Sequence, residues 1–484
     1  MAEVSEDPKF TLRLLIDEEK NKVFLAEADR DFVDVLFSFL TLPMGTIVRL
    51  IEKHRKSESI GCFSNLYNSV ADVGVDNFET EACQEMLLNP RSVKGIHCKR
   101  LKLNINPVDD LNYFKCSSFS DCNVCSKFSG SECVCGELMD QKIELSEEDQ
   151  LASGGSIRNG VDGVFVKGRS SFIITDDFLV SVGSTGLVLK TLNRLGCSDV
   201  SKLGEQFLDV GLQEILTLLE NMIFSNTPLT NTFLKKQSPR DVNDIQKLLM
   251  SLGVKVKTEF TLELDAIVRK QDMKILYVEC GEDFVDFLFT FLAVPLEFVC
   301  DINLGCIGNL RRSFKDLSVV DHTASKCVLP YYYKCQKQLS GITIEEPPEY
   351  YRYRNSNPRQ PDYSLTTDPD RTLLYRKDRL VPVTLIDPKC RGKDQSENGS
   401  GGFVKRGTRF TVTDDLIITP RNSLSTSICL LKKLQIQADD LEVQVISIRE
   451  AEAMSLMRAS LLTSSALNSA FWNLIAKKKI KEET

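Results

Sequence analysis

Short blocks from the first half of this chain return in the same order in the second half. The blocks and their counterparts are Phe10–Leu14 and Phe260–Leu264, Asp31–Pro43 and Asp283–Pro295, Gly61–Leu66 and Gly305–Leu310, Phe165–Asp177 and Phe403–Asp415, and Glu214–Phe233 and Glu452–Phe471. Chance does not order so many blocks in this way, so we infer two diverged tandem copies of one unit. We place the first copy at residues 1–240, a linker at 241–257 and the second copy at 258–484.

Each copy mixes strand and helix patterns. Phe10–Ile16 and Val23–Ala26 flank a turn-like acidic segment, which predicts a β-hairpin that the second copy should repeat. Ser171–Thr175 and Phe410–Thr413 are rich in β-forming residues and predict strands. Helices are expected near 186–195 and 212–224. The expected fold class is therefore α+β, with mixed α/β layers.

The Asp31–Pro43 block predicts a helix that is apolar on nearly every side and therefore buried. Asp31 and Asp34 have the spacing of an N-cap and N3 pair, which predicts a capping box at the start of this helix. Pro43, and Pro295 in the second copy, should end it.

Composition narrows the class of protein. The formal net charge of -8 and the pI near 5.3 disfavour broad nucleic-acid binding, which requires a basic face. The first residues lack the pattern of a secretory signal, and the longest apolar run is too short to span a membrane. We therefore expect a cytoplasmic protein, with the basic Lys477–Lys481 tail leaving a nuclear location open.

Three of these features together, the DFVDVLFSFLTLP block, the Gly–Cys block and the FVK…TDD block, resemble a plant family known as domain of unknown function 674. The resemblance covers nearly the whole chain, in both halves. It implies a duplicated soluble protein, and it implies no activity and no catalytic residues.

The first copy carries a cysteine-rich insert at residues 113–140, and its cysteines suggest a zinc site. The five are Cys116, Cys122, Cys125, Cys133 and Cys135. The C-x2-C spacing of Cys122 and Cys125 suits two thiolates on one tetrahedral ion, and Cys133 and Cys135 could supply the other two, with Gly136 allowing a tight turn. Reduced thiols that bind nothing are the alternative.

Cys116 has a second interpretation. Its Tyr-Phe-Lys-Cys context returns in the second copy, which keeps only Cys335 of the cluster, so both could be packing residues. We therefore favour the other four as the ligand set and keep Cys116 as a fifth candidate.

Paired carboxylates and nearby basic residues suggest a site for an anion or another small ligand. Each pair follows a strand, and basic residues lie in the FVK block before it; the candidates are Lys167, Arg169, Asp176 and Asp177 in the first copy and Lys405, Arg409, Asp414 and Asp415 in the second. Paired acids can perform acid–base chemistry, but helix caps and turns are the more common use of aspartate, and we favour that structural role.

The function expected from these features is that of a non-enzymatic interaction or regulatory scaffold with a protein partner. The Tyr350–Arg354 stretch is the best candidate for an exposed partner contact, because Tyr and Arg are enriched at binding hot spots. The surrounding 345–379 segment should contain little regular structure. Two alternatives remain: a hydrolase or transferase acting on a small anionic substrate, and a zinc-dependent nucleic-acid binder.

Overall fold

The computed structural model describes residues 8–54, 60–92, 95–107, 112–145, 163–166, 171–194, 196, 201, 203–234, 261–299, 305–317, 349–354, 363–369, 380–386, 402–421, 428, 431–432 and 437–482. Helices and strands alternate through both halves, so the prediction of a mixed α+β fold is confirmed. The predicted linker at 241–257 lies outside the described residues.

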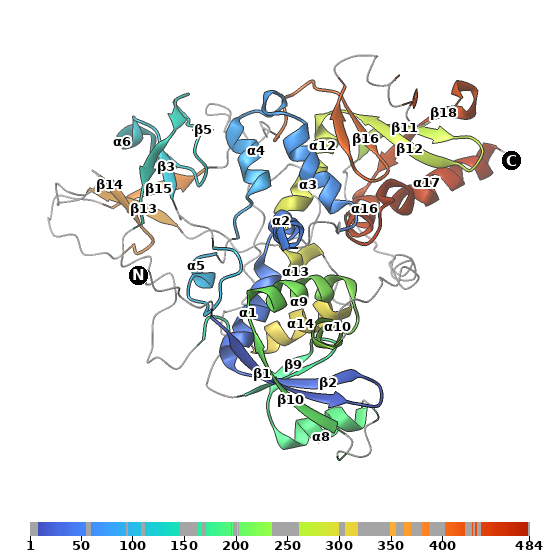
Figure 1. The fold of residues 1–484 in the computed structure, drawn as a ribbon. Coiled ribbons are helices and arrows are strands. Elements are labelled where there is room, and N and C mark those ends of the chain that lie inside the picture. The colour runs from blue at the N-terminus through green and yellow to red at the C-terminus, as the bar shows by residue number, and fades with distance from the viewer. Residues whose placement is uncertain are drawn as a thin grey trace, which may run out of the picture.

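Each half contributes one five-stranded antiparallel sheet (Figure 1). The strands are β1 (Phe10–Asp17), β2 (Lys22–Ala28), β8 (Phe172–Thr175), β9 (Val180–Val182) and β10 (Leu203–Val210), and then β11 (Leu262–Arg269), β12 (Lys274–Cys280), β16 (Phe410–Thr413), β17 (Ile418–Pro420) and β18 (Leu441–Ile448). Their orders are β10-β1-β2-β8-β9 and β18-β11-β12-β16-β17. Both predicted hairpins are present. The two orders match strand for strand.

Helices from both halves lie between the two sheets or beside the second one (Figure 1). They are α1 (Arg30–Thr41), α2 (Met44–His54), α3 (Phe63–Asp72), α4 (Glu81–Leu88), α9 (Leu212–Phe224), α10 (Pro228–Phe233), α12 (Glu282–Ala293), α13 (Leu296–Val299), α14 (Gly305–Leu317), α16 (Glu450–Leu462) and α17 (Ala466–Glu482). Helix α8 (Thr185–Arg194) packs on the other face of the first sheet, where Leu192 meets Leu25 and Ile173. The short helix α5 (Gly95–Cys98) precedes the cysteine-rich insert.

Helices α1 and α12 are buried along almost their whole length. Every residue from 32 to 41 and from 284 to 293 is buried, as their all-round apolar pattern predicts. Both helices end just before Pro43 and Pro295, also as predicted. A helix without a polar face needs cover on all sides, and the cover comes from both halves: α1 contacts α13 and α14, and α12 contacts α2, α3 and α4.

The third repeated block reaches across to the opposite half. Helix α3 packs on β17 of the second half, and α14 packs on β9 of the first. Ser69 Oγ accepts a hydrogen bond of 2.9 Å from the backbone N–H of Ile418. Ser313 Oγ accepts one of 2.9 Å from the backbone N–H of Val180. Each half therefore packs one helix on a strand of the other half, and we call this arrangement the exchange of α3 and α14.

The asparagine of each block completes the same exchange. Asn65 Nδ2 donates to the carbonyl oxygen of Asp415 at 2.9 Å. Asn309 Nδ2 donates to the carbonyl oxygen of Asp177 at 2.9 Å. Since each helix donates a hydrogen bond to a turn of the opposite half, each half supplies polar partners that the other half needs.

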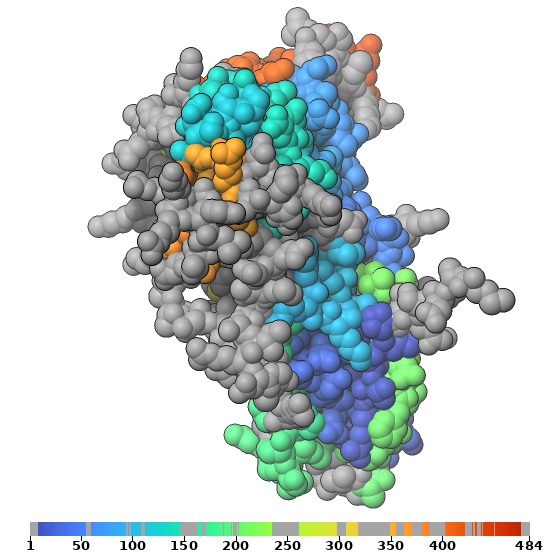
Figure 2. Space-filling view, turned by 90° about the vertical axis from the view of Figure 1, so that its left-hand side faces the viewer, coloured from blue at the N-terminus to red at the C-terminus, as the bar shows by residue number. Residues whose placement is uncertain are grey.

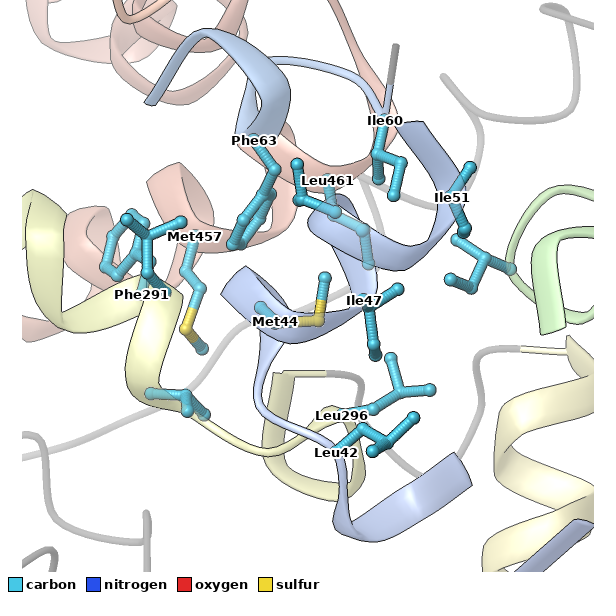
Figure 3. Close-up of a cluster of buried hydrophobic side chains, with 14 of the residues drawn as sticks. Leu42, Met44, Ile47, Ile51, Ile60, Phe63, Phe291, Leu296, Met457 and Leu461 are labelled. Atoms are coloured by element: carbon cyan, nitrogen blue, oxygen red, sulfur yellow. The ribbon is translucent and has the colours of Figure 1, made fainter. Parts of the chain in front are cut away.

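The two halves also meet along their proline segments. The backbone N–H of Met44 donates to Val294 at 2.9 Å, and that of Leu296 donates to Leu42 at 3.0 Å. Figure 3 shows apolar side chains from both halves converging around this contact, among them Ile47, Ile51, Ile60, Phe63, Phe291, Met457 and Leu461. One continuous hydrophobic core therefore includes residues of both halves.

The predicted capping box is wrong, because the structure uses its residues differently. Helix α1 begins at Arg30, and Asp29 caps it by accepting a hydrogen bond of 2.9 Å from the backbone N–H of Phe32. Asp31 lies inside the first turn, and Asp34 is buried one turn further along. The second copy has Gly281 at the N-cap, with no side-chain cap.

The buried aspartates instead hold the FVK segments. Asp34 accepts hydrogen bonds of 2.7–3.0 Å from the backbone N–H groups of residues 164–166. Asp286 accepts bonds of 2.8 and 3.0 Å from residues 403 and 404. A Cβ atom on Gly163 or Gly402 would overlap these carboxylates, so the close approach requires glycine.

A cut between the copies should leave the protein assembled. Aromatic pairs join the halves, including Phe37 with Phe314 at 5.2 Å and Phe78 with Phe289 at 5.9 Å between ring centroids. Burial of each such side chain contributes about 1.5–3 kcal/mol, so separated halves would expose too much apolar surface to stay folded. With a protease site inserted within 241–257 and cleaved, the two fragments should elute together in size-exclusion chromatography. Separate folded fragments would contradict this.

Replacing Asp34 with asparagine should lower the free energy of unfolding by about 1–3 kcal/mol near neutral pH, because an amide N–H would then face backbone donors. Chemical denaturation measures this. The half-exposed Asp31 provides the matched control, since the Asp31→Asn change should stay within about 0.5 kcal/mol. Equal effects of the two substitutions would contradict the anchoring role.

The same variant should alter the pH dependence of stability. Burial raises the pKa of Asp34 to about 6, against backbone hydrogen bonds that lower it. The folded protein then holds this proton more tightly than the unfolded chain, so the contribution is present at low pH and is lost as the pH rises through the folded pKa. The stability advantage of the wild type over Asp34→Asn should therefore grow between about pH 7 and pH 4. A constant difference would contradict the shift.

Candidate metal centre

The cysteine-rich insert joins a segment of the second half to form a small composite lobe, which comprises residues 112–145 and the described parts of 349–386. Its elements are β3 (Tyr113–Lys115), α6 (Phe119–Cys122), β4 (Val124–Cys125), β5 (Ser131–Glu132), β6 (Leu138–Met139), β7 (Gln141–Ile143), β13 (Tyr350–Arg354), β14 (Tyr363–Thr366) and β15 (Val381–Leu385). Figure 2 shows the cyan insert beside orange residues of the second half.

A four-stranded sheet of order β14-β13-β15-β4 links the two parts. Strands β15 and β4 are parallel, with Thr384 beside Val124 and Leu385 beside Cys125. The backbone N–H of Ile386 donates to Cys125 at 2.8 Å. The expectation of little regular structure within 345–379 was wrong, because β13 and β14 gain strand partners that only the folded chain brings near.

Four thiols of the insert come together at this junction. The Sγ atoms of Cys116, Cys122, Cys133 and Cys135 all lie within 4.8 Å of one another. Cys116 Sγ is 3.3 Å from that of Cys133 and 3.9 Å from that of Cys135. A tetrahedral ion with metal–sulfur bonds of about 2.3 Å separates its sulfurs by about 3.8 Å. The group could therefore hold a metal ion.

Two tight turns bring these four thiols toward one another. Cys122 ends α6, and the next residue, Asn123, has a φ of 50° that turns the chain into β4. Gly136 has a φ of 89°, and its N–H donates to Cys133 at 2.8 Å. The turn that the sequence assigned to Gly136 is thus present, and it places Cys133 and Cys135 side by side.

Cys125 is absent from the four-thiol group that the structure brings together, although the sequence favoured it over Cys116. Neighbouring residues of a strand point to opposite faces. On β4, Val124 faces the thiol side and packs with Cys116 and Cys133. Cys125 consequently faces a separate apolar cluster with Tyr113. The C-x2-C spacing does not bring Cys125 into the group, because the turn at Asn123 leads into β4 and the side chain of Cys125 lies on the face of β4 away from the other thiols.

Burial separates the acidities of these thiols. It raises the pKa of Cys116, and it raises the pKa of Cys122 to about 11. The pKa of Cys135, which is exposed, is lowered, mainly by a hydrogen bond from the backbone N–H of Glu137. Burial raises the pKa of Cys125 to about 12, as suits a neutral packing thiol.

Arg352 ties the two parts of the lobe together. Its Nε donates to Asn123 Oδ1 at 2.7 Å, and its NH2 group donates to the carbonyl oxygen of Ser120 at 2.7 Å. The guanidinium carbon lies 5.5 Å from the ring centroid of Phe119 and 5.0 Å from that of Tyr363. This residue therefore orients the turn that follows Cys122.

The Tyr350–Arg354 stretch is only partly exposed, contrary to the expectation. Tyr350 is buried, and its hydroxyl lies 2.9 Å from that of Tyr113. Tyr350 and Arg352 of this stretch thus contact the first half of the same chain. Tyr351 and Arg354 keep part of their surface exposed.

The family comparison agrees with the resemblance in the sequence blocks. The model of the family described as "Protein of unknown function (DUF674)" matches residues 6–451. The chain belongs to this family. No curated protein and no solved structure matches it.

The family match spans both sheets and the composite lobe, but its description names no activity. Among the helices within the described ranges, none combines the length and hydrophobicity of a membrane span.

The paired carboxylates of the first half accept hydrogen bonds from backbone and side-chain groups of the chain itself. Asp176 accepts hydrogen bonds from the backbone N–H of Thr230 at 2.9 Å and from its hydroxyl at 2.7 Å. Asp177 accepts one from Asn309 Nδ2 at 3.0 Å and another from the hydroxyl of Thr175. Both carboxylates therefore fix the β8 turn and its neighbours.

The second copy repeats this arrangement. Asp414 accepts a hydrogen bond of 2.8 Å from the backbone N–H of Asn468, and Asp415 accepts one from the hydroxyl of Thr413. Lys405 and Arg409 are exposed, whereas Lys167 and Arg169 lie outside the described residues. The described members of the candidate anion site thus serve turns or face solvent.

Replacing Arg352 with alanine should loosen the composite lobe. Hydrogen bonds made by a charged donor contribute about 1.5–3 kcal/mol, so amide hydrogen exchange in β4 and β15 should accelerate roughly tenfold or more. The exposed Arg354 on the same strand provides the matched control, and its alanine variant should exchange like the wild type. Equal acceleration in both variants would contradict the role given to Arg352.

Proposed function

We propose that this chain is a non-catalytic interaction scaffold whose composite lobe is held together by one structural zinc ion. The observation that carries the proposal is the gathering of four cysteine sulfurs within 4.8 Å of one another, beside the strand pairing of β4 with β15. An ion at this position would fix the junction between the two copies.

The donor set favours zinc. Four thiolates are soft ligands, which select zinc or an iron–sulfur cluster over magnesium or calcium. Sites with four protein ligands are typical of structural zinc, because catalytic zinc keeps one position for water or substrate. Cys116, Cys122, Cys133 and Cys135 would hold the ion, which would supply cross-linking of the chain and no reaction.

The lobe also has a need for such a cross-link. Its strands β4, β5 and β6 are two residues long, and its apolar clusters are small. Small scaffolds of this kind require disulfides or a metal in addition to their core. A structural zinc ion contributes about 10–16 kcal/mol of apparent binding free energy, which is ample for this purpose.

The scaffold role is favoured over catalysis because the paired aspartates are engaged in caps and turns. The net charge of -8 disfavours the zinc-dependent nucleic-acid binder. The partner is proposed to be a protein, since Tyr351 and Arg354 offer exposed surface of the residue types enriched at hot spots.

Purified full-length protein should contain one zinc ion per chain by elemental analysis. The Cys116→Ser variant should lose the ion, because only three thiolates remain. The Cys125→Ser variant should keep it, because Cys125 packs in the separate cluster with Tyr113. This pair of variants distinguishes the ligand set of the structure from the one that the sequence favoured.

Two results would overturn the proposal. A wild-type protein without metal, purified in the absence of chelators, would remove the zinc centre. Loss of zinc in Cys125→Ser with full retention in Cys116→Ser would remove this ligand set.

A further inference from the structure

We propose that Cys135 is an oxidation site, and that a hydroperoxide reacting there releases the metal and loosens the composite lobe. The metal release rests on the proposed zinc centre. The oxidation site itself rests on the positions of the four thiols.

The four thiols differ sharply in access. Cys116 and Cys133 have no exposed surface, Cys122 is half-buried, and Cys135 is exposed. Oxidation follows thiolate character and exposure, so a small oxidant arriving from solvent meets the Cys135 sulfur first. The surrounding turn leaves room, since a Cβ atom on Gly136 would meet nothing within 4 Å.

A second thiol lies close enough to form a disulfide with the oxidised Cys135. Cys116 Sγ lies 3.9 Å from Cys135 Sγ. A disulfide needs about 2.05 Å, so the two sulfurs must approach by roughly 2 Å. Cys135 lies in a short surface turn, while Cys116 is packed against Phe114 and Val124, so the turn is the part that moves.

The chemistry balances with a hydroperoxide as the oxidant. The Cys135 thiolate attacks one peroxide oxygen and the O–O bond breaks. The products are a sulfenic acid and hydroxide, or, when the peroxide is organic, a sulfenic acid and an alkoxide that takes a proton from water to become the alcohol. The Cys116 thiolate then attacks the Cys135 sulfur, forming the S–S bond and expelling hydroxide, which becomes water on protonation. Sulfur gives up two electrons in total, and the peroxide accepts them.

The product would hold metal poorly. Two of the four thiolates become a disulfide, leaving Cys122 and Cys133, and two ligands do not form the closed tetrahedral site. Cys122 is followed by Asn123, which receives the hydrogen bond from Arg352. Loss of the ion therefore weakens the contact between Asn123 of the first half and Arg352 of the second half.

The test treats the zinc-loaded full-length protein with hydrogen peroxide. A chromogenic chelator follows zinc release, peptide mass spectrometry maps disulfides, and hydrogen exchange reports on β4 and β15. The key variant is Cys135→His, which keeps a fourth zinc ligand and removes the reacting sulfur. Cys83→Ser changes a buried thiol outside the group and serves as the control.

The expected result is release of zinc from the wild type and the control together with a Cys116–Cys135 cross-link, and release at least roughly tenfold slower from Cys135→His. Equal release rates in wild type and Cys135→His, or a cross-link that omits Cys135, would overturn the oxidation site. If the purified protein holds no zinc, the zinc centre fails, and the peptide map alone then decides: a Cys116–Cys135 cross-link supports the oxidation site and its absence removes it.

Discussion

Two helices that are apolar on every side have to be covered on every side. In this protein α1 and α12 meet that requirement together, because α13 and α14 contact the first while α2, α3 and α4 contact the second. The reciprocal placement of α3 and α14 on the opposite sheets follows from the same need. The core is consequently shared, and each half covers apolar surface of the other.

Buried polar groups then give this apolar core a single arrangement. Asp34 and Asp286 hold the FVK segments through backbone N–H groups, and glycine next to each carboxylate allows the close approach. The Asp–Asp turns are held in turn by asparagines from the opposite half. Because an unpaired buried polar group costs about 1–3 kcal/mol, these contacts disfavour other packings of the same helices.

The composite lobe has the opposite character. Its strands are short and its apolar clusters small, so hydrophobic burial alone cannot hold it firmly. Arg352 and the four-thiol group lie where the two copies meet in the lobe. We therefore expect the lobe to loosen locally when one of these few contacts is lost.

The sequence by itself determined the elements whose signals are local. The hairpins, the buried helix ending at Pro43 and the strand before Asp176 follow from periodicity and turn residues. The cysteine cluster was visible from spacing, and so was the turn at Gly136.

Only the tertiary structure decided how these elements combine. The exchange of α3 and α14, the pairing of β15 with β4 and the anchoring by Asp34 join residues more than a hundred positions apart. No local pattern encodes such pairings. The place of Cys125 outside the four-thiol group has the same origin. Spacing puts Cys125 near the other cysteines, but Cys125 lies on β4 and faces the cluster with Tyr113, whereas its neighbour Val124 faces Cys116 and Cys133.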